Sequence, residues 1–115
     1  MSQIIDIQAE QLDGIVLQGK PVLLLIWIKS CDQCRRFKPI FNKLPEYYPG
    51  VQCLRMNMFD SIENLRLAEK YEKENTPILP VFCKGEHMGT FVGYYSLEAL
   101  RARLDEVFRE NECNS

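Results

Sequence analysis

The chain has 115 residues, and its 14 basic and 16 acidic side chains give a formal net charge of −2. This length fits one domain over residues 1–115, and the near-balanced charge favours neither a nucleic acid nor an anionic membrane surface as a partner. No apolar run approaches the ~20 residues that span a membrane, and residues 1–6 lack the pattern of a secretion signal. We therefore expect a cytoplasmic protein with no membrane and no nucleic-acid partner.

The first elements in chain order are a short strand at 4–7, a helix at 8–18 and a strand at 22–28. Residues 22–28 are seven consecutive apolar residues, rich in branched side chains, and the run is too short for a buried helix. Such a run is typical of a central strand that is covered on both faces. In open α/β sheets, functional groups commonly follow the carboxyl end of such a strand.

A helix is expected next from Asp32 to about Tyr47, because apolar residues recur there at three- and four-residue steps. Pro39 falls inside this helix and should kink it. A strand at 51–58 and a helix from Asp60 to Lys73 follow. The expected buried face of the later helix consists of Ile62, Leu65, Ala68 and Tyr71.

The last elements are a strand at 76–83, a hairpin turn at 84–86, a strand at 87–92 and a helix at 97–109. Pro80 lies within the first of these strands. Because proline lacks the N–H group that a strand ladder needs, a bulge or an unpaired stretch is expected there. The complete order is β-α-β-α-β-α-β-β-α, which indicates an α/β protein.

Cys31 and Cys34 are separated by two residues, directly after the strand at 22–28 and at the start of a helix. Two thiols at this spacing can close a disulfide reversibly, and a helix N-terminus lowers the pKa of the first thiol. The pair therefore indicates redox chemistry. Half of a zinc site is the alternative, but the sequence has no second Cys pair, and its one histidine, His87, lies in the hairpin. No metal is expected.

The other three cysteines are far apart in the sequence, and we expect all of them to be reduced. Cys53 and Cys83 lie in apolar strands, where cysteine behaves as a small buried hydrophobe. Cys113 lies in the polar tail and is expected to be exposed. The protein is thus expected to be a monomer, with dimers through Cys113 as the alternative.

The element order, with the thiol pair after the second strand, resembles thioredoxin over most of the chain. In that family a tryptophan lies four residues before the first cysteine and a proline five residues after the second, as Trp27 and Pro39 do here. Pro77 stands at the place of the family's cis-proline. Its spacing to the pair Val92-Gly93 also matches the family pattern.

This resemblance implies the thioredoxin fold, a central mixed five-stranded sheet flanked by four helices. A glutaredoxin is the alternative, because the hairpin over residues 81–89 is similar to one in that family. Two features argue against a glutaredoxin. The residues between the cysteines are not that family's usual Pro-Tyr, and aligning the hairpin with that family places its cis-proline at Leu79, which is not a proline.

The resemblance also implies a thiol–disulfide oxidoreductase, in which Cys31 attacks a substrate disulfide and Cys34 resolves the mixed disulfide. No bound cofactor is implied beyond the redox-active disulfide that the two cysteines form. The implied partners are protein disulfides and an electron donor, either a reductase of the thioredoxin-reductase type or a dithiol pool. The implied substrate-binding residues are Trp27, Thr76, Pro77, Val92 and Gly93.

Asp32 and Gln33 replace the family's usual Gly-Pro between the cysteines, so a carboxylate lies beside the attacking sulfur. The carboxylate opposes thiolate formation, whereas Lys29, Arg35 and Arg36 favour it. Because both arginines are expected to point around the helix toward solvent, we expect the carboxylate to have the more local effect. The first thiol should then have a pKa somewhat above the roughly 7 of a typical thioredoxin nucleophile.

Leu25 replaces the buried acid that the family places six residues before the first cysteine. Arg55 should then lack a partner, and deprotonation of Cys34 should be slower. Ser30 replaces a second tryptophan and thins the apolar surface around the thiols. These departures keep a second function open, that of a thioredoxin-like adaptor or binding module with weak or regulatory redox activity.

Overall fold

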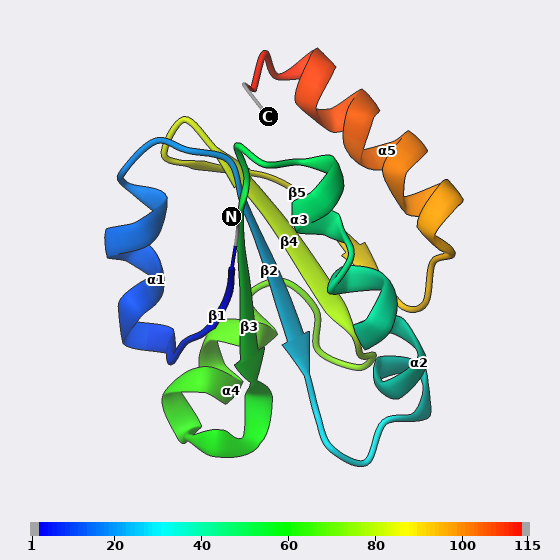
Figure 1. The fold of residues 1–115 in the computed structure, drawn as a ribbon. Helices are drawn as coiled ribbons and strands as arrows, with labels where there is room; N and C mark the ends of the chain where they lie inside the picture. Colours follow the sequence, from blue (N-terminus) through cyan, green and yellow to red (C-terminus); the bar gives the residue numbers. More distant parts are fainter. Residues whose placement is uncertain (1–2, 114–115) are drawn as a thin grey trace.

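The computed structural model describes residues 3–113 and contains one five-stranded sheet with helices on both faces (Figure 1). The strands are β1 (Ile4–Asp6), β2 (Val22–Trp27), β3 (Gln52–Asn57), β4 (Ile78–Cys83) and β5 (Glu86–Val92). The helices are α1 (Ala9–Val16), α2 (Asp32–Phe41), α3 (Leu44–Tyr47), the 3-10 turn η1 (Met58–Asp60), α4 (Ile62–Glu69) and α5 (Leu97–Glu110).

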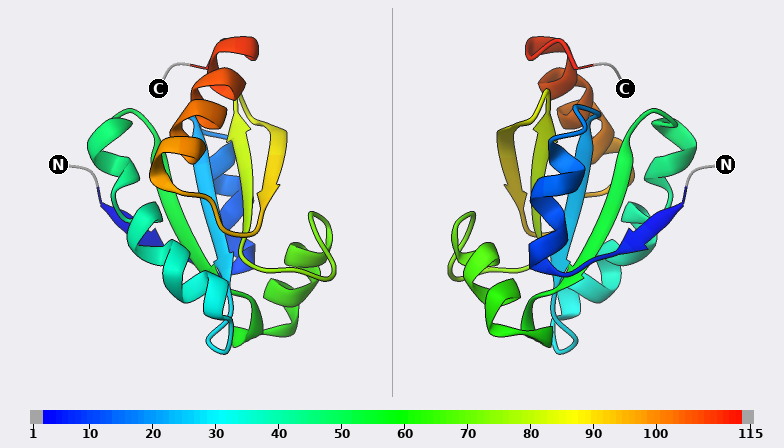
Figure 2. Two further views of the ribbon diagram at one scale, coloured as in Figure 1. Left: turned by 90° about the vertical axis from the view of Figure 1, so that its right-hand side faces the viewer. Right: turned by 90° about the vertical axis from the view of Figure 1, so that its left-hand side faces the viewer.

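β2 is the central strand of the sheet, whose order is β1-β3-β2-β4-β5. β1, β3 and β2 pair in parallel, whereas β4 pairs antiparallel with both β2 and β5, so the sheet is mixed. Helices α1 and α4 cover one face, and α2, α3 and α5 cover the other (Figure 2), which buries residues 22–26 completely. The expected mixed sheet between two helical layers is confirmed. Within residues 3–113, no helix is long and apolar enough to cross a membrane.

The prediction of one continuous helix over residues 32–47 is wrong, because the chain forms two helices, α2 and α3. Pro39 lies inside α2, and the break comes only after Phe41. Pro45 explains this position: it has no N–H for the carbonyl of Phe41 four residues earlier, and its ring clashes with that carbonyl in a continuous helix. Proline is tolerated in the first turn of a new helix, which is where α3 places it.

Helix α4 is shorter than the predicted 60–73, and its inward face differs. Ile62, expected in the core, is 57% exposed, whereas Asn64 is completely buried. The Asn64 Oδ1 accepts a hydrogen bond from the N–H of Ala9 at 2.7 Å, and its Nδ2 donates to the carbonyl of Asn57 at 2.9 Å. The polar side chain of Asn64 thus holds α4 against the start of α1 and the end of β3. The apolar pattern predicts Ile62, not Asn64, on the buried face of this helix.

Pro80 lies in β4 at an irregular part of the sheet, as expected. The recorded pairs between β2 and β4 join Leu23 to Val81 and Ile26 to Ile78, and Pro80 falls between them. On the other side, the register with β5 shifts between Val81 and Phe82. The missing N–H of proline is therefore accommodated within a strand near the centre of the sheet.

A disulfide joins Cys83, at the end of β4, to Cys113, after α5. The expectation that these two cysteines are reduced is wrong, and Cys113 is half-buried instead of an exposed thiol that could form dimers. Helix α5 packs along the sheet and returns the tail to the β4–β5 hairpin, so the two sulfurs meet across a sequence separation of 30. Cys53 is a free, buried thiol, as expected.

Candidate active site

The first thiol of the pair caps the helix that follows β2. Cys31 is the N-cap residue of α2, and its Sγ accepts a hydrogen bond from the N–H of Cys34 at 3.1 Å. An acceptor in this position faces the positive end of the helix dipole, which favours a negative charge on it. Residues 22–26 of β2 are buried in the core, and the chain leaves the sheet after Trp27, four residues before Cys31, whose side chain is partly accessible.

A second segment reaches the same sulfur from the loop before β4. The hydroxyl of Thr76 donates a hydrogen bond to Cys31 Sγ at 3.1 Å, and the carbonyl oxygen of Thr76 lies 3.6 Å from that sulfur. Burial opposes ionisation of Cys31, but the hydrogen bonds from Cys34 and Thr76 outweigh it and lower the pKa of this thiol below its ordinary value. The Thr76–Pro77 peptide is cis, so Pro77 has the conformation that the sequence predicted for it.

Cys34 has the opposite character. Its side chain is 3% exposed, and burial, together with its hydrogen bond to Cys31, raises the pKa of this thiol to about 11. At neutral pH, Cys31 is therefore the thiol that ionises more readily. This asymmetry suits a reaction in which one sulfur attacks first and the second reacts later.

A small cavity of about 150 Å³ opens beside the two thiols. Trp27, at the end of β2, forms one wall, and the Nζ of Lys38 lies 4.3 Å from the centre of its ring. The remaining lining residues are Ile28, Lys29, Cys31, Cys34 and Arg35. An aromatic wall and cationic side chains thus line the cavity beside Cys31. Pro39 is exposed about two turns along α2 and does not line this cavity.

The loop after β5 lies against the cis-proline. Val92 pairs with Ile78, and the N–H of Gly93 donates to the carbonyl of Pro77 at 2.8 Å. Gly93 has a φ of +89°, a conformation that glycine adopts without strain. The structure therefore places Trp27 and Thr76 beside Cys31, with Pro77 next to Thr76 and the pair Val92–Gly93 against Pro77 and its neighbour Ile78. These are the residues that the resemblance predicted to bind substrate.

His87, the histidine of the hairpin, lies in β5, where its Nε2 is 2.8 Å from the hydroxyl of Thr90. Its ring packs beside those of Tyr71 and Phe82. Among residues 3–113, no three His, Cys, Asp or Glu side chains form a cluster that could hold a metal ion.

A family model described as Thioredoxin matches residues 3–106. The chain belongs to the thioredoxin family. It is 31% identical over 91 residues to a thioredoxin of Acidithiobacillus ferridurans, across 79% of this chain and 82% of that protein. It is 28% identical over 99 residues to the chloroplastic M-type thioredoxin of Brassica napus, across 84% of this chain but only 54% of that protein. The structure of spinach chloroplast thioredoxin f has the same fold, with a TM-score of 0.80 at 21% identity over 92% of this chain and 94% of that one.

Membership of the thioredoxin family supports thiol–disulfide oxidoreductase chemistry in general. The position of the cis-proline agrees with the thioredoxin alignment. The glutaredoxin alignment would instead need a cis-proline at Leu79, which lies inside β4.

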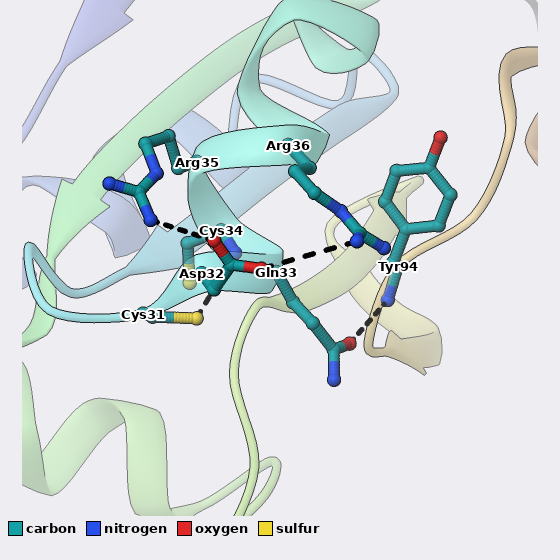
Figure 3. A network of polar contacts seen from close by, with 7 residues as sticks. All are labelled: Cys31, Asp32, Gln33, Cys34, Arg35, Arg36 and Tyr94. Atoms are coloured by element: carbon teal, nitrogen blue, oxygen red, sulfur yellow. Dashed lines mark hydrogen bonds and ion pairs between the residues drawn. The ribbon is translucent and has the colours of Figure 1, made fainter.

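Asp32 departs from the thioredoxin pattern, but its charge is paired. The carboxylate accepts a hydrogen bond from Nη2 of Arg35 at 2.7 Å and lies 4.0 Å from Nη1 of Arg36 (Figure 3). The hydrogen bond from Arg35 and the nearby positive charges lower the pKa of the Asp32 carboxyl. Both arginines are exposed, as expected, yet at three and four residues along α2 they share the helix face of Asp32. The carboxylate is therefore less free to oppose the thiolate than we expected.

Gln33, the other residue between the thiols, contacts the loop after β5. Its Oε1 accepts a hydrogen bond from the N–H of Tyr94 at 3.1 Å (Figure 3), and the guanidinium of Arg36 lies 5.1 Å from the centre of the Tyr94 ring. No signal in the sequence pairs Gln33 with Tyr94, which is 61 positions away. Sequence reasoning therefore missed this contact.

Leu25 is completely buried in β2 and lies opposite Arg55 of β3. Arg55 does not lack a partner, which corrects the expectation from the thioredoxin pattern. Its Nε and Nη2 donate to the two carboxylate oxygens of Asp6 at 2.9 and 3.2 Å. Because β1 pairs with β3, the counter-charge comes from the edge of the sheet and not from β2. An apolar side chain remains where other thioredoxins place an acid near the second thiol.

Proposed function

We propose that this protein reduces protein disulfides through a reversible Cys31–Cys34 dithiol–disulfide couple. The observation that carries the proposal is the contrast between the two thiols. Hydrogen bonds from Thr76 and from the start of α2 stabilise a thiolate on Cys31, whereas burial keeps Cys34 protonated. Thiol–disulfide exchange requires an accessible thiolate first and a second thiol within reach of the mixed disulfide.

In the first step, the Cys31 thiolate attacks one sulfur of a substrate disulfide. The substrate S–S bond breaks, its second sulfur leaves as a thiolate that takes a proton from water, and a mixed disulfide with Cys31 forms. In the second step, Cys34 loses its proton to water and attacks Cys31 Sγ as a thiolate. The mixed disulfide breaks, the remaining substrate sulfur leaves as a thiolate that takes a proton from water, and the Cys31–Cys34 disulfide forms. Two electrons pass to the substrate, and an external dithiol or a reductase restores the dithiol.

The proposed docking surface for an extended substrate is the backbone beside Cys31, on Thr76 and the loop at Val92–Gly93. An extended peptide can pair with these groups while its disulfide sulfur approaches Cys31. The cavity beside Trp27 would hold the side chain next to the disulfide. Its lysine and arginine side chains favour acidic groups there.

The test is dithiothreitol-driven reduction of insulin by the wild-type protein and by Cys31→Ser. The variant should lose the protein-dependent rate. Cys53→Ser, a substitution at a buried free thiol of β3, is the matched control and should keep it. A Cys31→Ser protein as fast as the wild type would refute the proposal. In Cys34→Ser, the mixed disulfide should persist as a covalent adduct that dithiothreitol releases.

The second candidate is a thioredoxin-like adaptor with weak or regulatory redox activity. The observation that favours it is Leu25, because an apolar residue at that position provides no carboxylate to accept the proton of Cys34. The insulin assay separates the two functions. A reductase reduces insulin as the wild type but not as Cys31→Ser, whereas an adaptor gives the same rate with either protein. In a binding assay, an adaptor also binds its partners equally well as the wild type and as Cys31→Ser.

A further inference from the structure

The side-chain amide of Gln33 covers the backbone of the loop after β5. Its Oε1 accepts the Tyr94 N–H at 3.1 Å, and it lies so close to Gly93 that a Cβ added there would be 3.4 Å away. Figure 3 shows the side chain of Gln33 extending from the start of α2 to this loop. Gln33, which lies between the two thiols in the sequence, thus contacts the loop that packs against Pro77.

That loop continues an edge of the sheet. β5 is the last strand in the sheet order, and an edge strand and the loop after it present backbone groups that an extended peptide can pair with. The N–H of Gly93 is already used, because it donates to the carbonyl of Pro77. The next backbone donor along the loop is the N–H of Tyr94. A peptide carbonyl and the side-chain amide of Gln33 each offer an amide oxygen as the acceptor, so they compete for the N–H of Tyr94.

We propose that Gln33 is a specificity-determining residue that occupies the Tyr94 N–H in the free protein and is displaced by an extended polypeptide substrate. This inference rests on the proposed function and deepens it. A polypeptide replaces the amide of Gln33 with its own backbone carbonyl and covers the loop. A small disulfide reaches Cys31 without touching Tyr94, so its reduction does not depend on the displacement.

The geometry lets Gln33 move while the loop stays in place. Gln33 is exposed, whereas the Tyr94 ring is held by Arg36 at 5.1 Å and by an edge-to-face contact with Phe37 at 6.3 Å between ring centres. Both of these contacts come from α2 and do not involve the amide of Gln33. Displacement therefore exposes a donor that is already positioned for a substrate.

The experiment compares wild type and Gln33→Ala in the reduction of insulin and of hydroxyethyl disulfide. The ratio of the insulin rate to the hydroxyethyl disulfide rate should rise roughly two- to tenfold in Gln33→Ala, through a lower KM for insulin, which is the effect of removing one competing neutral hydrogen bond. Gln33→Glu keeps an acceptor in place, so its KM for insulin should stay at or above the wild-type value. Gln18→Ala, an exposed glutamine after α1, is the control and should leave both rates unchanged.

An unchanged ratio, or a higher KM for insulin in Gln33→Ala, would overturn the proposal. Hydrogen exchange of the Tyr94 amide, followed by NMR, provides a readout that does not depend on activity. Exchange should be faster in Gln33→Ala than in wild type, and equal exchange would also overturn the proposal. If the wild type reduces neither disulfide, the proposed function fails, and the specificity role of Gln33 fails with it.

Discussion

The hydroxyl of Thr76 donates a hydrogen bond to Sγ of Cys31 over 3.1 Å, although the two residues are 45 positions apart. The bond stabilises the thiolate more than the thiol and is one of the causes of the lowered pKa of Cys31. Thr76→Val removes this donor and keeps the shape of the side chain. The alkylation rate of Cys31 by iodoacetamide at neutral pH should then fall by roughly two- to tenfold, because a hydrogen bond at such a half-exposed site contributes about 0.5–1.5 kcal/mol.

The direction in which the alkylation midpoint moves follows from which form of Cys31 reacts. Only the thiolate is alkylated, so a donor that stabilises it moves the pH–rate midpoint down, and its removal moves the midpoint up. Thr90→Val, the same substitution on β5, is the control and should leave the midpoint unchanged. A Thr76→Val midpoint equal to that of the wild type would show that the hydroxyl does not stabilise the thiolate.

Asp32 should influence Cys31 less than Thr76 does. Its carboxylate is bound by Arg35 and lies near Arg36, so these charges largely offset one another. Asp32→Asn removes a negative charge and should lower the alkylation midpoint of Cys31, but by less than Thr76→Val raises it. The measurement is the same pH series at low and at high salt. A larger shift in Asp32→Asn than in Thr76→Val would mean that the carboxylate acts on the thiolate despite its pairing.

Asn64→Ala should destabilise the fold by about 2–4 kcal/mol, because it removes a completely buried side chain and leaves the half-buried N–H of Ala9 and carbonyl of Asn57 without their partner. Urea unfolding followed by circular dichroism measures this loss. Arg66→Ala, an exposed position on the same helix, is the control and should change the free energy of unfolding by less than ~0.5 kcal/mol. Equal unfolding midpoints for Asn64→Ala and the wild type would contradict the anchoring role of Asn64.

The Cys83–Cys113 disulfide should stabilise the protein independently of the active site. It closes a loop with a sequence separation of 30, for which the chain-entropy relation gives about 3–4 kcal/mol. Cys113→Ser should lower the free energy of unfolding by up to this amount. Wild-type protein kept in reductant should unfold like Cys113→Ser, and a further loss in the variant under reductant would show that the substitution acts by some other route.

Local patterns predicted much of the fold. The seven apolar residues at 22–28 predicted the central strand because a run of that length is too short for a buried helix and is typical of a strand covered on both faces. The pair Cys31 and Cys34 predicted the candidate redox site because two thiols at this spacing share one helical turn. The prediction was wrong where the apolar period conflicted with proline geometry. The period continues through residues 32–47, but Pro45 has no N–H for the carbonyl of Phe41, so α2 ends there and α3 begins.

The sequence by itself thus determined the family, the five strands in their order along the chain and the two candidate redox thiols, since each depends on residues that are close together or at recognisable spacings. Only the tertiary structure decided what surrounds the thiols: Thr76 on Cys31, Gln33 on Tyr94, and Asp6 instead of a β2 acid on Arg55. It also decided that Cys83 and Cys113 are joined. The physical reason is that these contacts link residues 30 to 61 positions apart, and strand pairing together with packing of the helices on the sheet, not any local period, brings them together.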